Sequence, residues 1–225
     1  MKKETTQKQS TKITFIDLAI MFIIALPVIL FISNFYYKFQ NTMFSNADEL
    51  LFVHDSLSLI IICFSPGIIL FCIILHIRIN TSIKIMRVKI FLFIPIVVFI
   101  ISLFVLTLQF FKYTGVSNEG ISVRNGILSS SKNYTWSNVT DVEVSYELGY
   151  KHKVEIDYNI HLNDGIIVNA YNSEDFFSNI VNLDNFIKNK GIKIIRSNIK
   201  PSDYGEFDYV FHGDRMKVIL SILNK

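Results

Sequence analysis

The chain has 225 residues, of which 51% are hydrophobic and 18% are charged, and its formal net charge is +3. This charge is too small to indicate nucleic-acid binding, and a soluble domain of this length usually carries more charge and less Phe and Ile. The imbalance is local: residues 13–112 contain few acids and bases, whereas residues 113–225 have the composition of a soluble domain. We therefore expect a basic tail over residues 1–12, a membrane region and a polar domain, with the main boundary at Lys112.

Three apolar segments, residues 13–37, 57–77 and 90–111, are long enough to cross a bilayer. Each is expected to be a helix, because backbone donors and acceptors inside a bilayer must be paired within the protein. The first segment could instead be a cleaved signal peptide, since four lysines precede it. Its length and Asp17 near its start favour an uncleaved anchor.

The number of Lys and Arg residues beside each apolar segment predicts its orientation. The tail and the second loop have four each, whereas the first loop, residues 38–56, has one. We therefore expect a multi-pass protein of the plasma membrane, with its N-terminus in the cytoplasm and its C-terminal domain outside. In the second loop, Lys84, Arg87 and Lys89 are candidate contacts with anionic lipid, each worth about 1 kcal/mol.

From Tyr113 onwards, apolar residues alternate with polar ones, as in a sheet with one buried face. The sequences Asn125-Gly126 and Asp164-Gly165 are typical of two-residue hairpin turns, and a looser turn is expected at residues 118–120. The pattern predicts about six antiparallel strands before residue 171.

A helix is expected next, because apolar residues recur at helical spacing over residues 176–187. Asn172 or Ser173 is its expected N-cap, and Gly191 is expected to end it. Its apolar stripe should pack on the apolar face of the sheet.

Residues 193–225 form a C-terminal extension in this interpretation. Ile194 and its neighbours predict a short strand, and the apolar residues after Gly213 predict a terminal helix. The apolar stripe of that helix is expected to dock on the polar domain, and binding of a partner protein is the alternative.

Two stretches carry a resemblance to a known family. Tyr113–Gly126 contains two short hairpin patterns, and in Tyr134–Val144 an aromatic pair leads into a strand. Both are similar to the opening hairpins of bacterial pleckstrin-homology-like domains, which commonly follow a few membrane helices. The resemblance covers residues 113–192 and implies an α+β domain, in which a partly open antiparallel barrel or two crossed sheets are capped by a helix.

The resemblance implies no enzyme activity and no cofactor. Eukaryotic relatives of the fold bind phosphoinositides through a basic pocket, for which Arg124 and Lys132 are too few here. Many members of the family hold the domain in the cytoplasm, whereas the charge count predicts that this domain lies outside.

No catalytic, cofactor-binding or metal-binding pattern is present in the sequence. The five histidines have no partner at the spacing of metal ligands, and Trp136 is expected to pack in the domain core. We therefore expect a non-enzymatic binding or scaffold protein, whose partners are the lipid bilayer and a protein or peptide at the cell envelope. The alternatives are an immunity protein against membrane-active peptides and an accessory subunit of a transporter or envelope assembly.

Overall fold

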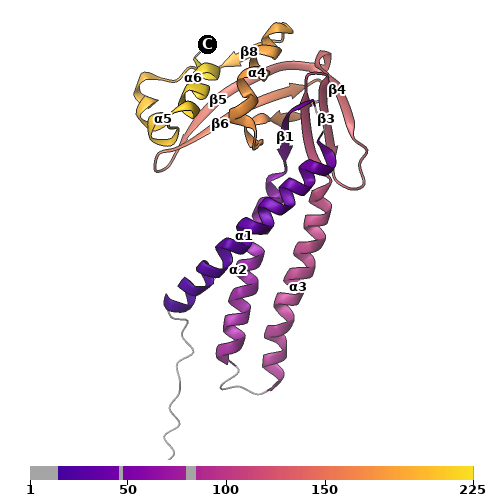
Figure 1. Cartoon of the computed structure of the whole chain (residues 1–225), viewed down its shortest axis with the longest axis vertical. Coiled ribbons are helices and arrows are strands. Elements are labelled where there is room, and N and C mark those ends of the chain that lie inside the picture. Colours follow the sequence, from indigo (N-terminus) through magenta and orange to yellow (C-terminus); the bar gives the residue numbers. More distant parts are fainter. Residues whose placement is uncertain (1–14, 46–47, 80–84, 225) are drawn as a thin grey trace, which may run out of the picture. The chain divides into compact units, whose positions relative to one another are not determined.

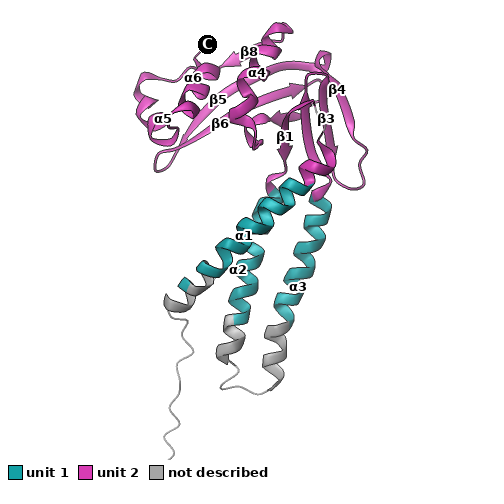
Figure 2. Cartoon of the chain, viewed as in Figure 1, with its two compact units in different colours: residues 1–39, 57–109 teal, residues 40–56, 110–225 magenta. Residues whose placement is uncertain are grey.

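The computed structural model describes residues 15–45, 48–79 and 85–224. The chain divides into two compact units, which are described separately (Figure 2). Unit 1 comprises residues 1–39 and 57–109, and unit 2 comprises residues 40–56 and 110–225.

Unit 1 is built from three long helices (Figure 1). They are α1 (Phe15–Phe44), α2 (Ser56–Ile79) and α3 (Ile85–Phe110). Each contains a window that is long and apolar enough to cross a membrane: Ile23–Phe44, Ser56–Ile73 and Phe93–Phe110. The three predicted apolar segments are therefore confirmed as helices. The first continues beyond its predicted end at residue 37, because residues 38–44 also adopt helical structure.

The described parts of these helices expose large apolar side chains on several faces, as expected for helices surrounded by lipid. Hydrogen bonds join these helices within unit 1: the Tyr36 hydroxyl donates to the Leu106 carbonyl at 3.0 Å, and the hydroxyls of Tyr37 and Ser58 lie 3.1 Å apart. A cavity of about 430 Å³ lies between the three helices, and Ser65 and Ser102 are its only polar lining residues.

Unit 2 contains two four-stranded sheets that are not closed into a barrel. The first sheet has the order β1 (Glu49–His54), β2 (Lys112–Ser117), β3 (Gly120–Asn125), β4 (Lys132–Thr135), and all its pairs are antiparallel. The second has the order β7 (Ile167–Asn169), β6 (Lys153–Leu162), β5 (Val139–Gly149), β8 (Ile194–Arg196). Strand β8 runs parallel to β5, and the other pairs are antiparallel. Six strands, β2–β7, lie where about six were predicted.

Strand β1 corrects the prediction that residues 38–56 form a loop of the membrane region. It pairs with β2, matching His54 with Tyr113, and its Leu51 is 1% exposed in the domain core. The predicted boundary at Lys112 therefore misses one segment of the C-terminal domain, since residues 40–56 also belong to unit 2. Local sequence carries no sign of this pairing, because the two strands are separated by two apolar helices.

Two turns also differ from the prediction. Asn118 and Glu119 form the tight connection between β2 and β3, whereas β3 and β4 are joined by a six-residue loop, residues 126–131. This loop is longer than the two-residue Asn125-Gly126 hairpin that was predicted. At its base, the Gly126 amide donates to the Phe111 carbonyl at 3.2 Å.

Helices cover the two sheets in unit 2. They are α4 (Phe176–Asn189), α5 (Tyr204–Val210) and α6 (Asp214–Leu223). The predicted α4 is confirmed, but its N-cap is Asp175 rather than Asn172 or Ser173. Gly191 adopts a φ of 73° directly after it, as expected for a residue that ends a helix.

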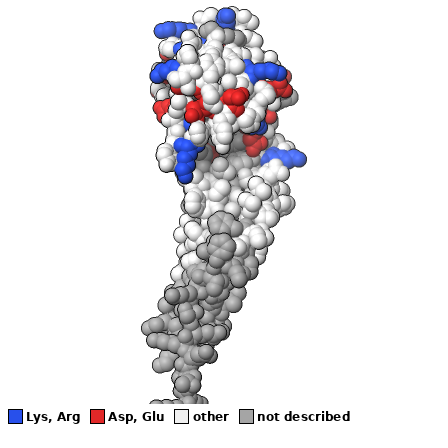
Figure 3. Space-filling model, turned by 90° about the vertical axis from the view of Figure 1, so that its left-hand side faces the viewer, with Lys and Arg blue, Asp and Glu red and all other residues white. Residues whose placement is uncertain are grey.

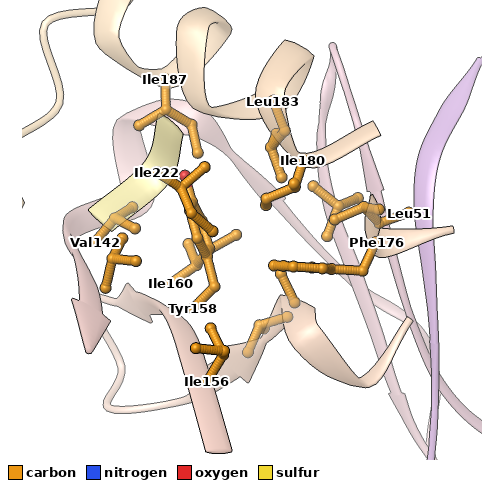
Figure 4. Close-up of a cluster of buried hydrophobic side chains, with 14 of the residues drawn as sticks. Leu51, Val142, Ile156, Tyr158, Ile160, Phe176, Ile180, Leu183, Ile187 and Ile222 are labelled. Carbon is orange, nitrogen blue, oxygen red and sulfur yellow. The ribbon is translucent and has the colours of Figure 1, made fainter. Parts of the chain in front are cut away.

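One apolar core joins the sheets and the helices (Figure 4). The stripe of α4 supplies Phe176, Ile180, Leu183 and Ile187, which meet Ile160 of β6 and other buried side chains. The C-terminal extension is part of this domain, because β8 joins the second sheet and the buried residues of α6 belong to the same core. Docking of the terminal helix is thus confirmed.

Candidate functional site

One end of the first sheet lies next in sequence to helices that are long and apolar enough to cross a membrane. His54 precedes Ser56, the first residue of α2, by two positions, and Lys112 follows Phe110, the last residue of α3, by two. Consecutive Cα atoms are 3.8 Å apart, so each residue lies within about 8 Å of an apolar helix end. The pairing register adds Tyr113, Arg124 and Asn125 to the same end. We call these five residues the membrane edge.

Aromatic side chains gather at the membrane edge around Arg124. Its guanidinium carbon lies 5.0 Å from the ring centre of Phe111 and 5.9 Å from that of Phe44. Tyr113 stacks on Phe44 at 4.8 Å and on Phe52 at 5.3 Å. Aromatic and basic residues of this kind are typical of the interface between a bilayer and water.

Gln40, the first α1 residue in unit 2, forms hydrogen bonds to Phe110, Lys112 and His54 in the same region. It is 1% exposed, and its amide nitrogen donates to the carbonyls of Phe110 and Lys112 at 2.8 and 3.2 Å. These bonds satisfy a carbonyl at the end of α3 that has no partner within the helix. They also orient the Gln40 side chain so that its oxygen faces Nδ1 of His54, 2.7 Å away.

His54 is neutral at physiological pH. Burial lowers the pKa of its imidazole to about 4, because a low-dielectric environment disfavours the charged ring. Since the Gln40 oxygen can only accept a hydrogen bond, Nδ1 of His54 carries the proton and donates to it. The buried pair therefore holds one tautomer of the histidine.

A polar pocket of about 250 Å³ opens at the membrane edge, between the first sheet and β7. An ion pair between Lys112 and Asp55, with Nζ and Oδ1 2.9 Å apart, lies at this pocket. The side chain of Asn169 has a partner at each end. Its Nδ2 donates to the Asp157 carboxylate, and its Oδ1 accepts from the backbone amide of Tyr171. These paired groups form a structured polar surface.

A larger groove, of about 810 Å³, lies at the opposite end of the first sheet, and we call it the distal groove. The Asn118–Glu119 turn forms one wall, and Lys190 and Lys193, which follow α4, lie along the other. Trp136 is also part of the lining, but its indole is buried. Its Nε1 donates to the carbonyls of Ser117 and Asn118 at 3.1 Å, and its ring packs on Phe186, so it serves the core as predicted.

The side chains predicted from the sequence to contact anionic lipid lie outside the described residues. Lys84 lies outside the described residues, as do the side chains of Arg87 and Lys89 at the start of α3. Within the described part of unit 2, charged side chains gather on the surface, and the described helix surface is nearly free of them (Figure 3). The membrane edge and the distal groove were missed, because both combine residues that are distant in sequence.

No group of histidine, cysteine and carboxylate side chains that could hold a metal occurs among the described residues. His161 contacts Asp141 at 2.8 Å, and His152 contacts Glu206, so both histidines have carboxylate partners at the surface. Lys153 contacts Glu155 on the same strand.

Comparison with models of known protein families gave no match, and comparisons with curated proteins and with solved structures gave no match of significance. The geometry of the two surfaces is therefore the basis for interpreting what the chain does.

Proposed function

We propose that the chain is a non-enzymatic integral membrane protein that presents a pleckstrin-homology-like binding domain at the cell envelope to a protein or peptide. The observation that carries this proposal is the distal groove, defined above by Asn118, Glu119, Trp136, Lys190 and Lys193. It lies about 17 Å from the membrane edge along β2, because a strand rises roughly 3.3 Å per residue. A partner bound there approaches from the aqueous side of the domain.

The chemistry of the groove favours an extended, acidic segment. Strand β4 is at the edge of the first sheet, so one of its sides has no strand partner within the described residues, and its Thr135 lines the groove. An extended peptide can add to such an edge through main-chain hydrogen bonds. The ammonium groups of Lys190 and Lys193 outnumber the carboxylate of Glu119 in the lining, and they supply charge complementarity to acidic side chains.

The test is a charge reversal in the groove of the full chain. Lys190→Glu with Lys193→Glu should abolish co-purification of the partner in mild detergent. The matched control, Lys151→Glu with Lys200→Glu, changes the net charge equally at positions outside the groove and should leave co-purification intact. Equal recovery with both variants, or equal loss with both, would contradict the groove as the binding site.

We also infer that the C-terminal domain faces the extracytoplasmic side. The charge count favours this orientation. The pairing of β1 with β2 requires only that residues 49–54 and the C-terminal domain lie on the same side, as the predicted topology has them. Protease added to cells with a permeabilised outer layer should then remove the domain. Protection until the cells are lysed would invert the orientation.

A second candidate function is immunity against membrane-active peptides. The apolar cavity of about 430 Å³ between α1, α2 and α3 favours it, since an apolar peptide face could enter there. Under this alternative, Ser102→Leu would fill part of the cavity and reduce protection of cells against the peptide. Under the proposed function the same variant would leave peptide sensitivity unchanged.

A further inference from the structure

Two large apolar side chains lie at the tip of the β3–β4 loop, residues 126–131. Leu128 is 100% exposed and Ile127 is 42% exposed. The rest of the loop consists of Gly126 and three serines. Single exposed apolar residues are common on soluble domains, so exposure alone does not indicate a binding partner. The position of this pair in the fold is the evidence for what covers it.

The base of this loop is bonded to the residue that follows a membrane helix. The Gly126 amide donates to the carbonyl of Phe111, and Phe111 directly follows the apolar window that ends at Phe110. Asn125 pairs with Lys112. Strand β2 starts at the membrane edge and β3 returns to it, so the loop leaves the sheet at the same end as the residues that follow α3.

The charges beside the loop indicate whether attraction to anionic lipid or burial of apolar side chains would attach the loop to a bilayer. Lys112 is paired with Asp55 at 2.9 Å, and Lys132 lies 3.8 Å from Asp164. Each pair is neutral as a whole, so Arg124 on its aromatic rings is the remaining cation of the membrane edge. Attachment to a lipid surface through this edge would therefore depend on apolar burial more than on anionic lipid.

We propose that Ile127 and Leu128 insert into the boundary between headgroups and acyl chains of the bilayer that holds α3. This inference rests on the membrane anchoring in the proposed function. The loop is then a second attachment of the domain to the lipid surface, in addition to the chain connections at α1, α2 and α3. The insertion depth of such apolar side chains is about 5–10 Å, which matches a tip close to the end of α3.

The test places an environment-sensitive fluorophore at the loop tip of the full chain. Leu128→Cys is made in a background in which Cys63 and Cys72 are replaced by Ser, labelled, and reconstituted into phosphatidylcholine vesicles. Part of the lipid carries a spin label near the carbonyl end of its acyl chain, in both leaflets, so the orientation of the protein does not matter. Since Leu128 is fully exposed, the substitution removes no contact within the protein.

The labelled loop should emit at shorter wavelength than a label at Asn118→Cys in the same vesicles, and it should lose fluorescence to the spin-labelled lipid. Its quenching by aqueous iodide should be weak, and added anionic lipid should change neither result. A label at Asn118→Cys, on the exposed turn at the other end of the first sheet, is the matched control and should be quenched by iodide alone.

A third label, on native Cys63 in α2 with Cys72 replaced, separates the two ways of failing. Lipid quenching of Cys63 without quenching of Leu128 would refute the insertion and leave the membrane anchoring intact. Absence of quenching at both positions would refute the anchoring itself. Protection of Leu128 from iodide and lipid alike would mean that protein, such as a second copy of the chain, covers the loop, and this too would overturn the proposal.

Discussion

Removal of the Asp184 carboxylate should cost unit 2 a large part of its stability. Asp184 is fully buried in α4, and its two oxygens accept hydrogen bonds from Nη2 of Arg196 at 2.7 and 2.9 Å. The Tyr158 hydroxyl donates to the same carboxylate at 3.1 Å. Arg196 also donates to the Ile222 carbonyl, so the group links β6, α4, β8 and α6.

The expected cost follows from the burial of both charges. Arg196 is 10% exposed, so Asp184→Ala leaves a buried cation without its anion. Breaking a buried pair in this way costs about 3–5 kcal/mol, within a total stability that is about 5–15 kcal/mol for a typical domain. Tyr158→Phe should cost only about 1 kcal/mol, because it removes one neutral donor to a carboxylate that keeps its main partner.

A double variant tests whether the pair itself is needed. Asp184→Leu combined with Arg196→Met replaces both charges with apolar side chains, and it should destabilise less than Asp184→Ala alone. Denaturation by urea of the full chain in detergent would be followed by the fluorescence of Trp136, the only tryptophan. Because Trp136 lies in the core of unit 2, its signal reports on this unit. A loss below about 1 kcal/mol for Asp184→Ala would refute the reasoning.

Three further predictions use the same assay. Leu51→Ala should destabilise unit 2 by about 2–5 kcal/mol. The control Leu148→Ala, at a position 44% exposed, should cost less than about 1 kcal/mol. Equal losses of stability would contradict the placement of β1 in the core. Because the folded state depresses the pKa of His54 to about 4, the unfolded state binds the proton first as pH falls, so about 2–3 kcal/mol of stability should be lost between pH 6.5 and 4. His54→Phe should flatten this pH dependence, and an unchanged slope would assign it to other groups. Gln40→Ala should cost about 1–3 kcal/mol, because it removes the buried bonds of the Gln40 amide to the Phe110 and Lys112 carbonyls and to His54. A neutral effect would argue against the link between α1 and the sheet.

The local patterns of the sequence were reliable guides to single elements. The three apolar segments are helices because their length and composition leave no other way to pair the backbone in lipid. Helix α4 was predicted from its 3.6-residue spacing, and β5 and β6 from their alternation, since the periods of helix and strand differ. Each of these signals lies within one element, so no tertiary information is needed to detect it.

Pairings between distant segments were not visible in the same way. The residues of β1 were assigned to a loop because six residues between two apolar helices carry no period that stands out, and their partner β2 lies beyond α3. The N-cap of α4 was placed before Asp175 because several polar residues in a row can cap a helix, and the Ser173 hydroxyl does accept a hydrogen bond from the Asp175 amide. The distal groove joins the β2–β3 turn to residues that follow α4, so neither part of the sequence indicates it alone.

The sequence by itself determined that this protein has three apolar helices and a polar α+β domain, because composition and periodicity act over a few residues at a time. Only the tertiary structure decided that a strand from between the first two helices joins that domain. The physical reason is that a strand is stabilised by a partner that supplies its hydrogen bonds and buries one face, and that partner is set by the whole fold. The pairing of β1 with β2 brings His54 to the membrane edge, where the pairing of β2 with β3 places Arg124 on its aromatic rings.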